Sequence, residues 1–256
     1  MNGIRKNLGV ALAVAVCPLF ANAANAADWS ITELQYQYGK LDSPFAGGAA
    51  NTSVVTLQHA SGYSFGDVFF FVDMIDDGEV DGFNDKDAYG ELYTYFSSAK
   101  ILKRTYSGLI KDVGLMAGVN YDADAGFLSY MPGVYVDWNV PGFTFLRTHF
   151  AATVDDSDIA QKDGFQADLA WTRPFEIGGQ RFSFEGHMEY TVLESNVFGP
   201  QKDWFLAQPQ LRWDVGYALT GRKDQFFVGT EYQLWVNKLG TDVDESAFQA
   251  LGVWRF

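Results

Sequence analysis

The sequence predicts an all-β protein, a twelve-stranded antiparallel transmembrane β-barrel that follows a cleaved signal peptide. Three observations predict this fold. The chain ends on an alternating strand in which Phe248, Trp254 and Phe256 share one face while Gln249 and Arg255 occupy the other. Segments with the same two-residue period recur along the chain, as they do in membrane barrels. Acidic and amide side chains stand opposite the apolar face, where a water-filled lumen would be.

The first 26 residues have the form of a secretory signal. Arg5 and Lys6 precede an apolar run over 8–20, and small-residue triplets end at Ala23 and Ala26. Such segments are removed on export, so we expect residues 1–26 to be the signal peptide and 27–256 the barrel. The one cysteine, Cys17, lies in the signal. The mature chain therefore has no thiol for a disulfide or a metal site.

The first six strands are predicted from apolar side chains at every second position. They cover 33–38, 55–58, 68–74, 89–98, 113–122 and 134–139. For strand 89–98 the pattern does not show which face points to the lipid and which to the lumen. The apolar faces of the other five carry, in chain order, Leu34, Tyr36 and Tyr38; Val55 and Leu57; Val68, Phe70, Val72 and Met74; Val113, Leu115, Ala117, Val119 and Tyr121; and Val134, Val136 and Trp138.

The last six strands alternate more regularly and cover 146–154, 165–172, 181–192, 208–217, 226–237 and 246–256. The apolar faces of the first five carry Leu146, Phe150 and Val154; Phe165, Ala167, Leu169 and Trp171; Phe182, Phe184, Met188, Tyr190 and Val192; Leu211, Trp213, Val215 and Tyr217; and Phe226, Val228, Tyr232, Leu234 and Val236. Aromatic side chains near strand ends are expected to form girdles at the membrane surfaces: Trp29, Tyr36, Trp138, Trp171, Tyr217, Trp235 and Trp254.

The connections between strands alternate between acidic segments and mostly tight turns. Those after odd strands carry much of the acid and are assigned to the outside: 40–50, 76–87, 122–127, 155–163, 194–203 and 240–245. Those after even strands are mostly tight turns and are assigned to the periplasm: 62–66, 98–110, 140–142, 178–180 and 220–224. An even strand count returns the chain to its starting side, as bacterial barrels require.

The inward carboxylates exclude a soluble barrel with an apolar interior, where they would be costly unless hydrated or paired. They are Glu33, Asp73, Asp137, Asp168, Glu185, Glu189, Asp214 and Glu231. A polar interior inside an apolar wall is stable when lipid surrounds it, so we expect the outer membrane of a Gram-negative bacterium. The formal net charge of −14 argues against nucleic acid as a partner.

Several motifs together resemble one known family. They lie at 61–67 (SGYSFGD), 69–73 (FFFVD), 89–92 (YGEL), 137–143 (DWNVPGF), 181–186 (RFSFEG), 229–233 (GTEYQ), 235–240 (WVNKLG) and 253–256 (VWRF). They resemble the Tsx-like family of outer-membrane channels, which includes the OmpK proteins. The resemblance implies a monomeric barrel with a narrow pore, through which nucleosides pass passively by way of weak sites and without a cofactor.

A nucleoside channel needs aromatic faces to stack bases and polar groups to bind the ribose. The leading candidates are Phe69, Phe71 and Asp73, faced by Glu91, Tyr93 and Tyr95 on the next strand. Other pore-lining candidates are Arg147, His149, Glu185, His187, Arg212 and Glu231. Two plainer interpretations stay open, namely that the phenyl rings only plug the lumen and that the charged residues only neutralise its wall.

Three alternatives concern other functions. A sealed barrel with acidic outer loops would suit a bacteriophage receptor or adhesin. His59 and Ser61 have the spacing of an outer-membrane phospholipase, but no orienting Asn follows, so the chain is predicted not to be an enzyme. The loop 76–87 resembles a calcium loop with Ala88 in place of the bidentate acid, which favours a solvated acidic loop without bound metal.

Overall fold

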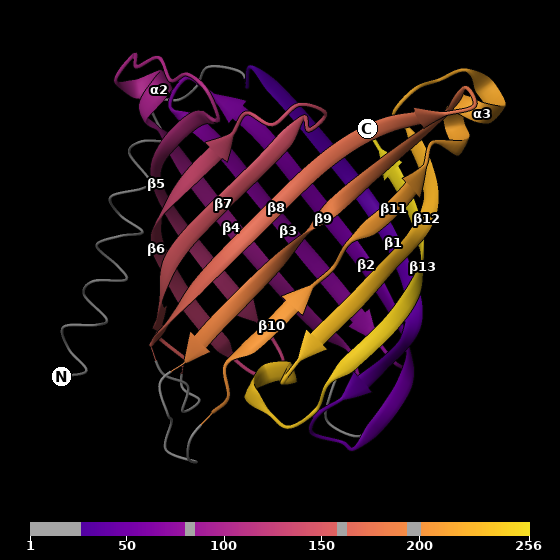
Figure 1. Cartoon of the computed structure of the whole chain (residues 1–256). Coiled ribbons are helices and arrows are strands. Elements are labelled where there is room, and N and C mark those ends of the chain that lie inside the picture. Colours follow the sequence, from indigo (N-terminus) through magenta and orange to yellow (C-terminus); the bar gives the residue numbers. More distant parts are fainter. Residues whose placement is uncertain (1–26, 80–84, 158–162, 194–200) are drawn as a thin grey trace.

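The computed structural model describes residues 27–79, 85–157, 163–193 and 201–256. The expected signal peptide lies outside the described residues. Neighbouring strands are antiparallel throughout, and the last strand pairs with the first, so the sheet closes into a barrel (Figure 1). No helix among the described residues is long and apolar enough to cross a membrane.

Thirteen strand segments make up twelve positions around the barrel. They are β1 (Trp29–Ser43), β2 (Gly48–Tyr63), β3 (Gly66–Asp76), β4 (Asp87–Ser97), β5 (Ile110–Asp122), β6 (Phe127–Trp138), β7 (Phe145–Asp155), β8 (Gly164–Ile177), β9 (Gln180–Leu193), β10 (Trp204–Ala207), β11 (Gln210–Trp213), β12 (Phe226–Val236) and β13 (Glu245–Arg255). Both β10 and β11 pair with β9 on one side and β12 on the other, so together they form one interrupted position. The predicted twelve-stranded barrel is confirmed.

The interruption lies at Pro209, which has no backbone N–H to donate. The chain stays attached on both sides because the Gln208 N–H donates to the His187 carbonyl and the Tyr232 N–H donates to the Pro209 carbonyl. Gly186 permits this close approach, since its φ is +142° and a Cβ there would lie 2.4 Å from the Gln208 carbonyl oxygen.

The predicted strand 208–217 is wrong in its second half. Val215 and Tyr217 belong to a short helix, α3 (Val215–Thr220). The Asp214 side chain accepts a hydrogen bond from the Tyr217 N–H, and Gly221 ends the helix in the left-handed conformation. These are ordinary helix N-terminal and C-terminal caps, and they outweigh the strand-like alternation of the segment.

Other element ends also differ from the prediction. The connection expected over 40–50 is much shorter, because β1 and β2 stay paired as far as Ser43 and Gly48. The connection 98–110 begins with a helical turn, α2 (Ser98–Ile101), whose N-terminus is capped by the Ser97 side chain. A short helix, η1 (Lys238–Gly240), follows β12.

The two ends of the barrel are distinct. Near Trp29 and Phe256 lie the turns after even-numbered positions, together with α2 and α3, and we call this the terminal end. The opposite end is where β3 and β7 finish and β4 and β8 begin, and η1 lies there too; we call it the loop end (Figure 1). The expectation that the loop end faces outward stays a prediction.

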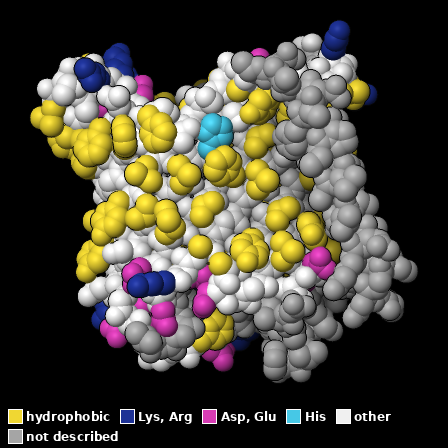
Figure 2. Space-filling view, turned by 180° about the vertical axis from the view of Figure 1, so that it is seen from behind, with side chains coloured by type: hydrophobic (Ala, Val, Ile, Leu, Met, Phe, Trp, Pro, Cys, Tyr) yellow, Lys and Arg dark blue, Asp and Glu magenta, His cyan; other side chains and the backbone are white. Residues whose placement is uncertain are grey.

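The predicted facing of the strands is confirmed over most of the barrel. Leu34, Leu115, Phe165, Leu211 and Phe248 are exposed on the outer surface. Figure 2 shows hydrophobic side chains spread over the middle of that surface, with most charged side chains toward the two ends. An apolar band between polar ends is the surface of a membrane-spanning barrel.

Four of the expected girdle residues are corrected, namely Trp29, Trp171, Tyr217 and Trp235. Tyr217 lies on α3 and not on a strand. Trp171 is nearly buried, with its ring 5.5 Å from that of Phe184. Trp235 lines the lumen, because it shares the parity of Glu231 and Gln233. Trp29 is exposed but also lines the lumen, because it shares the parity of Glu33. Tyr36 and Trp254 are exposed as expected.

Candidate functional site: the barrel lumen

The barrel encloses a cavity of about 1820 Å³ that is lined by side chains from every strand segment. All twelve residues singled out from the sequence line it. The structure distributes them over three zones, which we call the aromatic wall, the arginine cluster and the acidic belt. Their role in binding a solute stays a prediction.

The aromatic wall is a buried cluster on β4 to β7. It comprises Tyr93, Tyr95, Met116, Met131, Tyr135 and Ala151, with Phe69 of β3 packed against it. Gly118 on β5 makes room for the Tyr93 ring, since a Cβ there would lie 2.4 Å from a ring carbon. The wall narrows one side of the lumen with rings.

Arg147 on β7 covers the aromatic wall. Its guanidinium carbon lies 4.0 Å from the ring centroid of Tyr95 and 4.4 Å from that of Tyr135. The same group contacts Asp137 at 2.6 Å and Asp67 at 3.0 Å. Two carboxylates thus neutralise this arginine while its flat faces stack on the rings.

The arginine cluster lies on the arc formed by β1, β9, β11 and β13. Glu33 stands between Arg212 at 3.1 Å and Arg255 at 2.5 Å. Glu185 contacts the same two arginines at 3.2 Å and 3.5 Å. Two carboxylates balance two guanidinium groups, so this zone carries little net charge.

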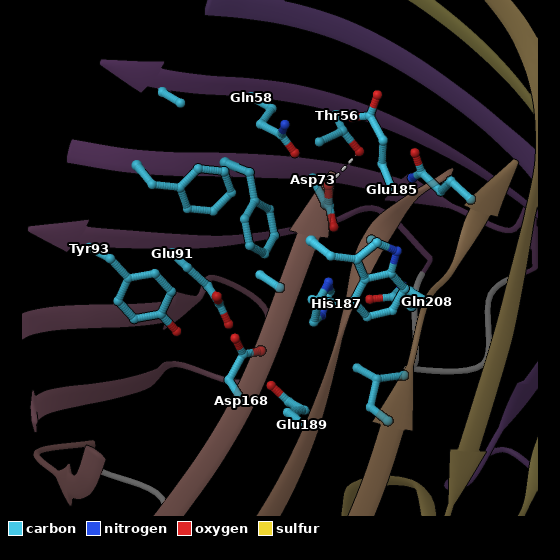
Figure 3. Close-up of a pocket in the computed structure, with 18 of the residues that line it drawn as sticks. Thr56, Gln58, Asp73, Glu91, Tyr93, Asp168, Glu185, His187, Glu189 and Gln208 are labelled. Carbon is cyan, nitrogen blue, oxygen red and sulfur yellow. Dashed lines mark hydrogen bonds between the residues drawn. The ribbon is translucent and has the colours of Figure 1, made fainter. Parts of the chain in front are cut away.

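The acidic belt consists of five lumen carboxylates between the other zones and the loop end: Asp73, Glu91, Asp168, Glu189 and Glu231. Figure 3 shows the Glu91, Asp168 and Glu189 side chains directed toward one another. Within the described part of the chain, none of the five forms an ion pair with Lys or Arg.

Neutral groups surround the acidic belt. Thr56 donates to Asp73 at 2.6 Å, and Gln210 and Gln249 donate to Glu231 at 2.6 Å and 2.8 Å. Glu91 accepts from the Tyr89 hydroxyl at 2.6 Å and from Asn120 Nδ2 at 3.0 Å. Glu189 accepts from Gln166 at 2.7 Å and from Trp204 Nε1 at 3.3 Å. Four of the five carboxyl groups, those of Asp73, Glu91, Glu189 and Glu231, are therefore held by hydrogen bonds from neutral groups and not by basic side chains.

The structure brings together the leading candidates. Phe69, Phe71 and Tyr89 form a row with ring centroids 6.2 Å and 6.0 Å apart. Phe71 is the direct cross-strand partner of Glu91. Arg147 and His149 instead join the aromatic wall, where the His149 ring lies 5.5 Å from that of Tyr93. Glu185 and Arg212 belong to the arginine cluster, and His187 lies beside the belt in Figure 3.

Sequence reasoning missed three lumen residues of consequence. Tyr89 has the parity of Glu91, Tyr93 and Tyr95 but stands at the first position of the predicted strand 89–98, and it was not named with them. Trp204 was assigned to the region after a long outer connection, although the alternation of Trp204, Leu206 and Gln208 continues across Pro209 into Gln210. Lys238 was missed because it lies outside any strand.

Lys238 fastens η1 at the loop end of the lumen. Its Nζ lies 2.8 Å from the Glu245 carboxylate and 2.6 Å from the Asp42 carbonyl oxygen, and both side chains of the pair are buried. Burial lowers the pKa of Lys238, and the Glu245 carboxylate opposes that change. This contact joins η1, β13 and the end of β1.

Among the described residues, neither the phospholipase-like pair His59 and Ser61 nor the calcium-like loop 76–87 forms a site. The Ser61 hydroxyl donates to the Tyr63 hydroxyl, whereas His59 Nδ1 lies 2.8 Å from the Thr32 hydroxyl and the His59 ring stacks on Phe70. Part of the calcium-like loop, 80–84, lies outside the described residues. Among those that are described, no group of three His, Asp or Glu side chains is arranged to hold a metal ion.

Comparison with known proteins supports the fold and leaves the family open. No protein-family model matches the chain, and no curated protein matches it in sequence. A KdgM porin superposes with a TM-score of 0.50, covering 88% of this chain and 99% of that chain at 8% identity. A NanC porin gives a TM-score of 0.51, covering 87% of this chain and 98% of that chain at 10% identity.

At such low sequence identity, the structural likeness to these porins establishes the fold alone. The chain therefore has the closed antiparallel fold of outer-membrane porins. Its apolar outer band and hydrogen-bonded polar lumen need lipid outside and water within. Both observations place the protein in the outer membrane of a Gram-negative bacterium.

Proposed function

We propose that this protein is a passive outer-membrane channel for nucleosides or similar small polar solutes, acting as a monomer without a cofactor. The observation that carries the proposal is the row of Phe69, Phe71 and Tyr89 beside the carboxylates of Asp73 and Glu91. Rings and acceptors stand side by side on β3 and β4 within one lumen.

This arrangement suits a solute with a flat face and hydroxyl groups. A base stacked on a ring gains roughly 1–3 kcal/mol, and ribose hydroxyls can donate to the Asp73 and Glu91 carboxylates. Weak contacts of this size select a solute and still release it, which a channel requires. The motifs that resemble the Tsx-like family, and the likeness in fold to the KdgM and NanC porins, also support a small-solute channel.

The proposal is tested by conductance of the refolded mature protein in planar bilayers. We expect small single-channel currents that adenosine or uridine reduces in a saturable way, while equimolar ribose or glycine has far less effect. Currents that nucleosides leave unchanged would contradict nucleoside specificity. Absence of current from a verified folded barrel would contradict the channel and favour the phage-receptor or adhesin alternative.

A further inference from the structure

We propose that Glu91, Asp168 and Glu189 form a binding site for the ammonium group of an organic cation passing through the lumen. This inference deepens the proposed function and rests on its channel, but it does not depend on nucleosides being the solute. It adds organic cations to the small polar solutes that the proposed channel would pass.

The three carboxylates come from separate parts of the sheet. Glu91 is on β4, while Asp168 and Glu189 are cross-strand partners on β8 and β9. Their side chains converge in the lumen (Figure 3), and they are close enough for their charges to interact with one another. Like charges gathered in one place are stabilised by a cation between them.

Unpaired polar atoms at the same place also call for a ligand that donates hydrogen bonds. Asn120 is 6% exposed, and its Nδ2 donates to Glu91. Its Oδ1 therefore lies close to the Glu91 carboxyl group, and it has no hydrogen-bond partner among the described residues. A buried acceptor left without a donor is costly, and an ammonium group, which has only donors, would satisfy it.

A second unpaired atom lies on the opposite side of the site. His149 is 3% exposed, its Nδ1 lies 3.5 Å from the Asp168 carboxylate, and its Nε2 has no partner among the described residues. In the tautomer with the proton on Nδ1, the Nε2 is another acceptor. The three carboxyl groups and Asn120 thus bring acceptors from β4, β5, β8 and β9 to the site, beside the His149 ring on β7.

Three arginines that line the lumen form ion pairs with carboxylates outside this site. Arg147 is occupied by Asp137 and Asp67, and Arg212 and Arg255 by Glu33 and Glu185. No described Lys or Arg pairs with the three carboxylates. A cation that enters the lumen therefore meets three carboxyl groups that have no basic partner among the described residues.

Aromatic rings favour an organic cation over a bare metal ion. The Tyr89 hydroxyl donates to Glu91, and the Trp204 indole donates to Glu189, so a ring adjoins the carboxylate on each side of the lumen. Ring faces attract ammonium groups through their quadrupole, and they can also contact the attached hydrocarbon. Carboxylates combined with Tyr and Trp are the chemistry of an amine site.

The experiment compares three molecules of similar length and different charge: putrescine, butane-1,4-diol and succinate. Each is titrated by calorimetry into the full mature barrel in detergent, which requires no conductance. We expect saturable binding of putrescine, with no heat from the other two. In bilayers, a potassium chloride gradient should give a reversal potential that shows preference for potassium over chloride.

The variant Asp168→Asn with Glu189→Gln keeps side-chain size and removes two charges. It should weaken putrescine binding by at least roughly tenfold, since charge-assisted hydrogen bonds are lost, and shift the reversal potential toward zero. The control Asp28→Asn removes one exposed charge outside the lumen sites and should change neither. The site would be overturned by any of three results: butane-1,4-diol binding as tightly as putrescine, a reversal potential that shows preference for chloride, or putrescine binding that the double variant leaves unchanged. Putrescine binding without nucleoside block would overturn the nucleoside proposal alone.

Discussion

At the residue scale, Arg147 contacts both the rings of the aromatic wall and two lumen carboxylates. It stacks on Tyr95 and Tyr135 and is paired with Asp137 and Asp67. Removing one member of a buried ion pair leaves its partner charged and unpaired, which is costlier than removing both. The arginine therefore stabilises the aromatic wall as well as neutralising its carboxylates.

We expect Arg147→Met to lower the free energy of unfolding by about 3–5 kcal/mol, the cost of breaking a buried pair. Urea unfolding of the barrel refolded in lipid vesicles measures it. Arg173→Met, at an exposed arginine near Phe143, is the matched control and should change stability far less. A loss no larger than that of the control would contradict this account of Arg147.

A second prediction concerns the aromatic row. Phe71 lies between Phe69 and Tyr89 with ring centroids about 6 Å away on each side. Phe71→Ala removes the central stacking surface, so nucleoside block should weaken while conductance stays or rises as the lumen widens. Single-channel recording with adenosine reads both quantities. If block and conductance are both unchanged, Phe71 is not at the binding site.

The residues that the sequence located best were those on strands with clear alternation. Phe69, Phe71 and Asp73 were predicted to face the lumen because Val68, Phe70, Val72 and Met74 define the opposite face, and they line the cavity. Trp204 was beyond the same reasoning, because it lies outside every predicted strand. Tyr89 was within its reach, since it shares the parity of Glu91.

At the scale of elements, the sequence predicted every strand position but not the ways in which strands end. β1 and β2 continue past their apolar stretch through polar residues that still pair. The segment after Trp213 keeps a strand-like pattern yet folds as α3, because the Asp214 cap satisfies helix N–H groups. Where a strand or helix ends depends on which neighbours in the folded protein bond its backbone N–H and C=O groups. The periodicity of the sequence does not identify those neighbours.

The short helix η1 yields a prediction at this scale. Lys238 ties it to Glu245 of β13 and to the Asp42 carbonyl of β1. Lys238→Met would leave the Glu245 carboxylate buried without its cation, so we expect a loss of about 3–5 kcal/mol in unfolding free energy. The double variant Lys238→Met with Glu245→Gln should recover part of the loss. Measured by urea unfolding, a double variant less stable than Lys238→Met alone would contradict a coupled pair.

At the scale of the whole molecule, the barrel separates its charges along the lumen. Arginines of the aromatic wall and the arginine cluster are each matched by carboxylates, while the acidic belt is matched by none of the described Lys and Arg side chains. The inward carboxylates predicted from the sequence are thus of two kinds. Only the three-dimensional structure separates those that pair with arginines from those that do not.

Closure of the barrel depends on the seam between β1 and β13. This seam pairs Glu33–Gly39 with Gln249–Arg255, a shorter stretch than the pairing of β1 with β2. A closed barrel leaves no strand edge exposed to lipid, where unpaired backbone groups would be costly. The sequence predicts closure only through the even strand count and the apolar face of the last strand, so the seam is the part of the fold that most needs a direct test.

Because the sequence has one cysteine, inside the expected signal, paired cysteines can test the seam. Tyr38 and Ala250 are direct partners across it, and directly opposed residues lie within disulfide range. We expect Tyr38→Cys with Ala250→Cys to form an intramolecular disulfide on mild oxidation, seen as a reducible shift in electrophoretic mobility of the unfolded chain. Tyr36→Cys with Ala250→Cys is offset by two residues, about 7–8 Å diagonally, and should cross-link far less. Equal cross-linking of the two pairs would mean that β13 does not pair with β1 in this register. The closed lumen described above would then be contradicted.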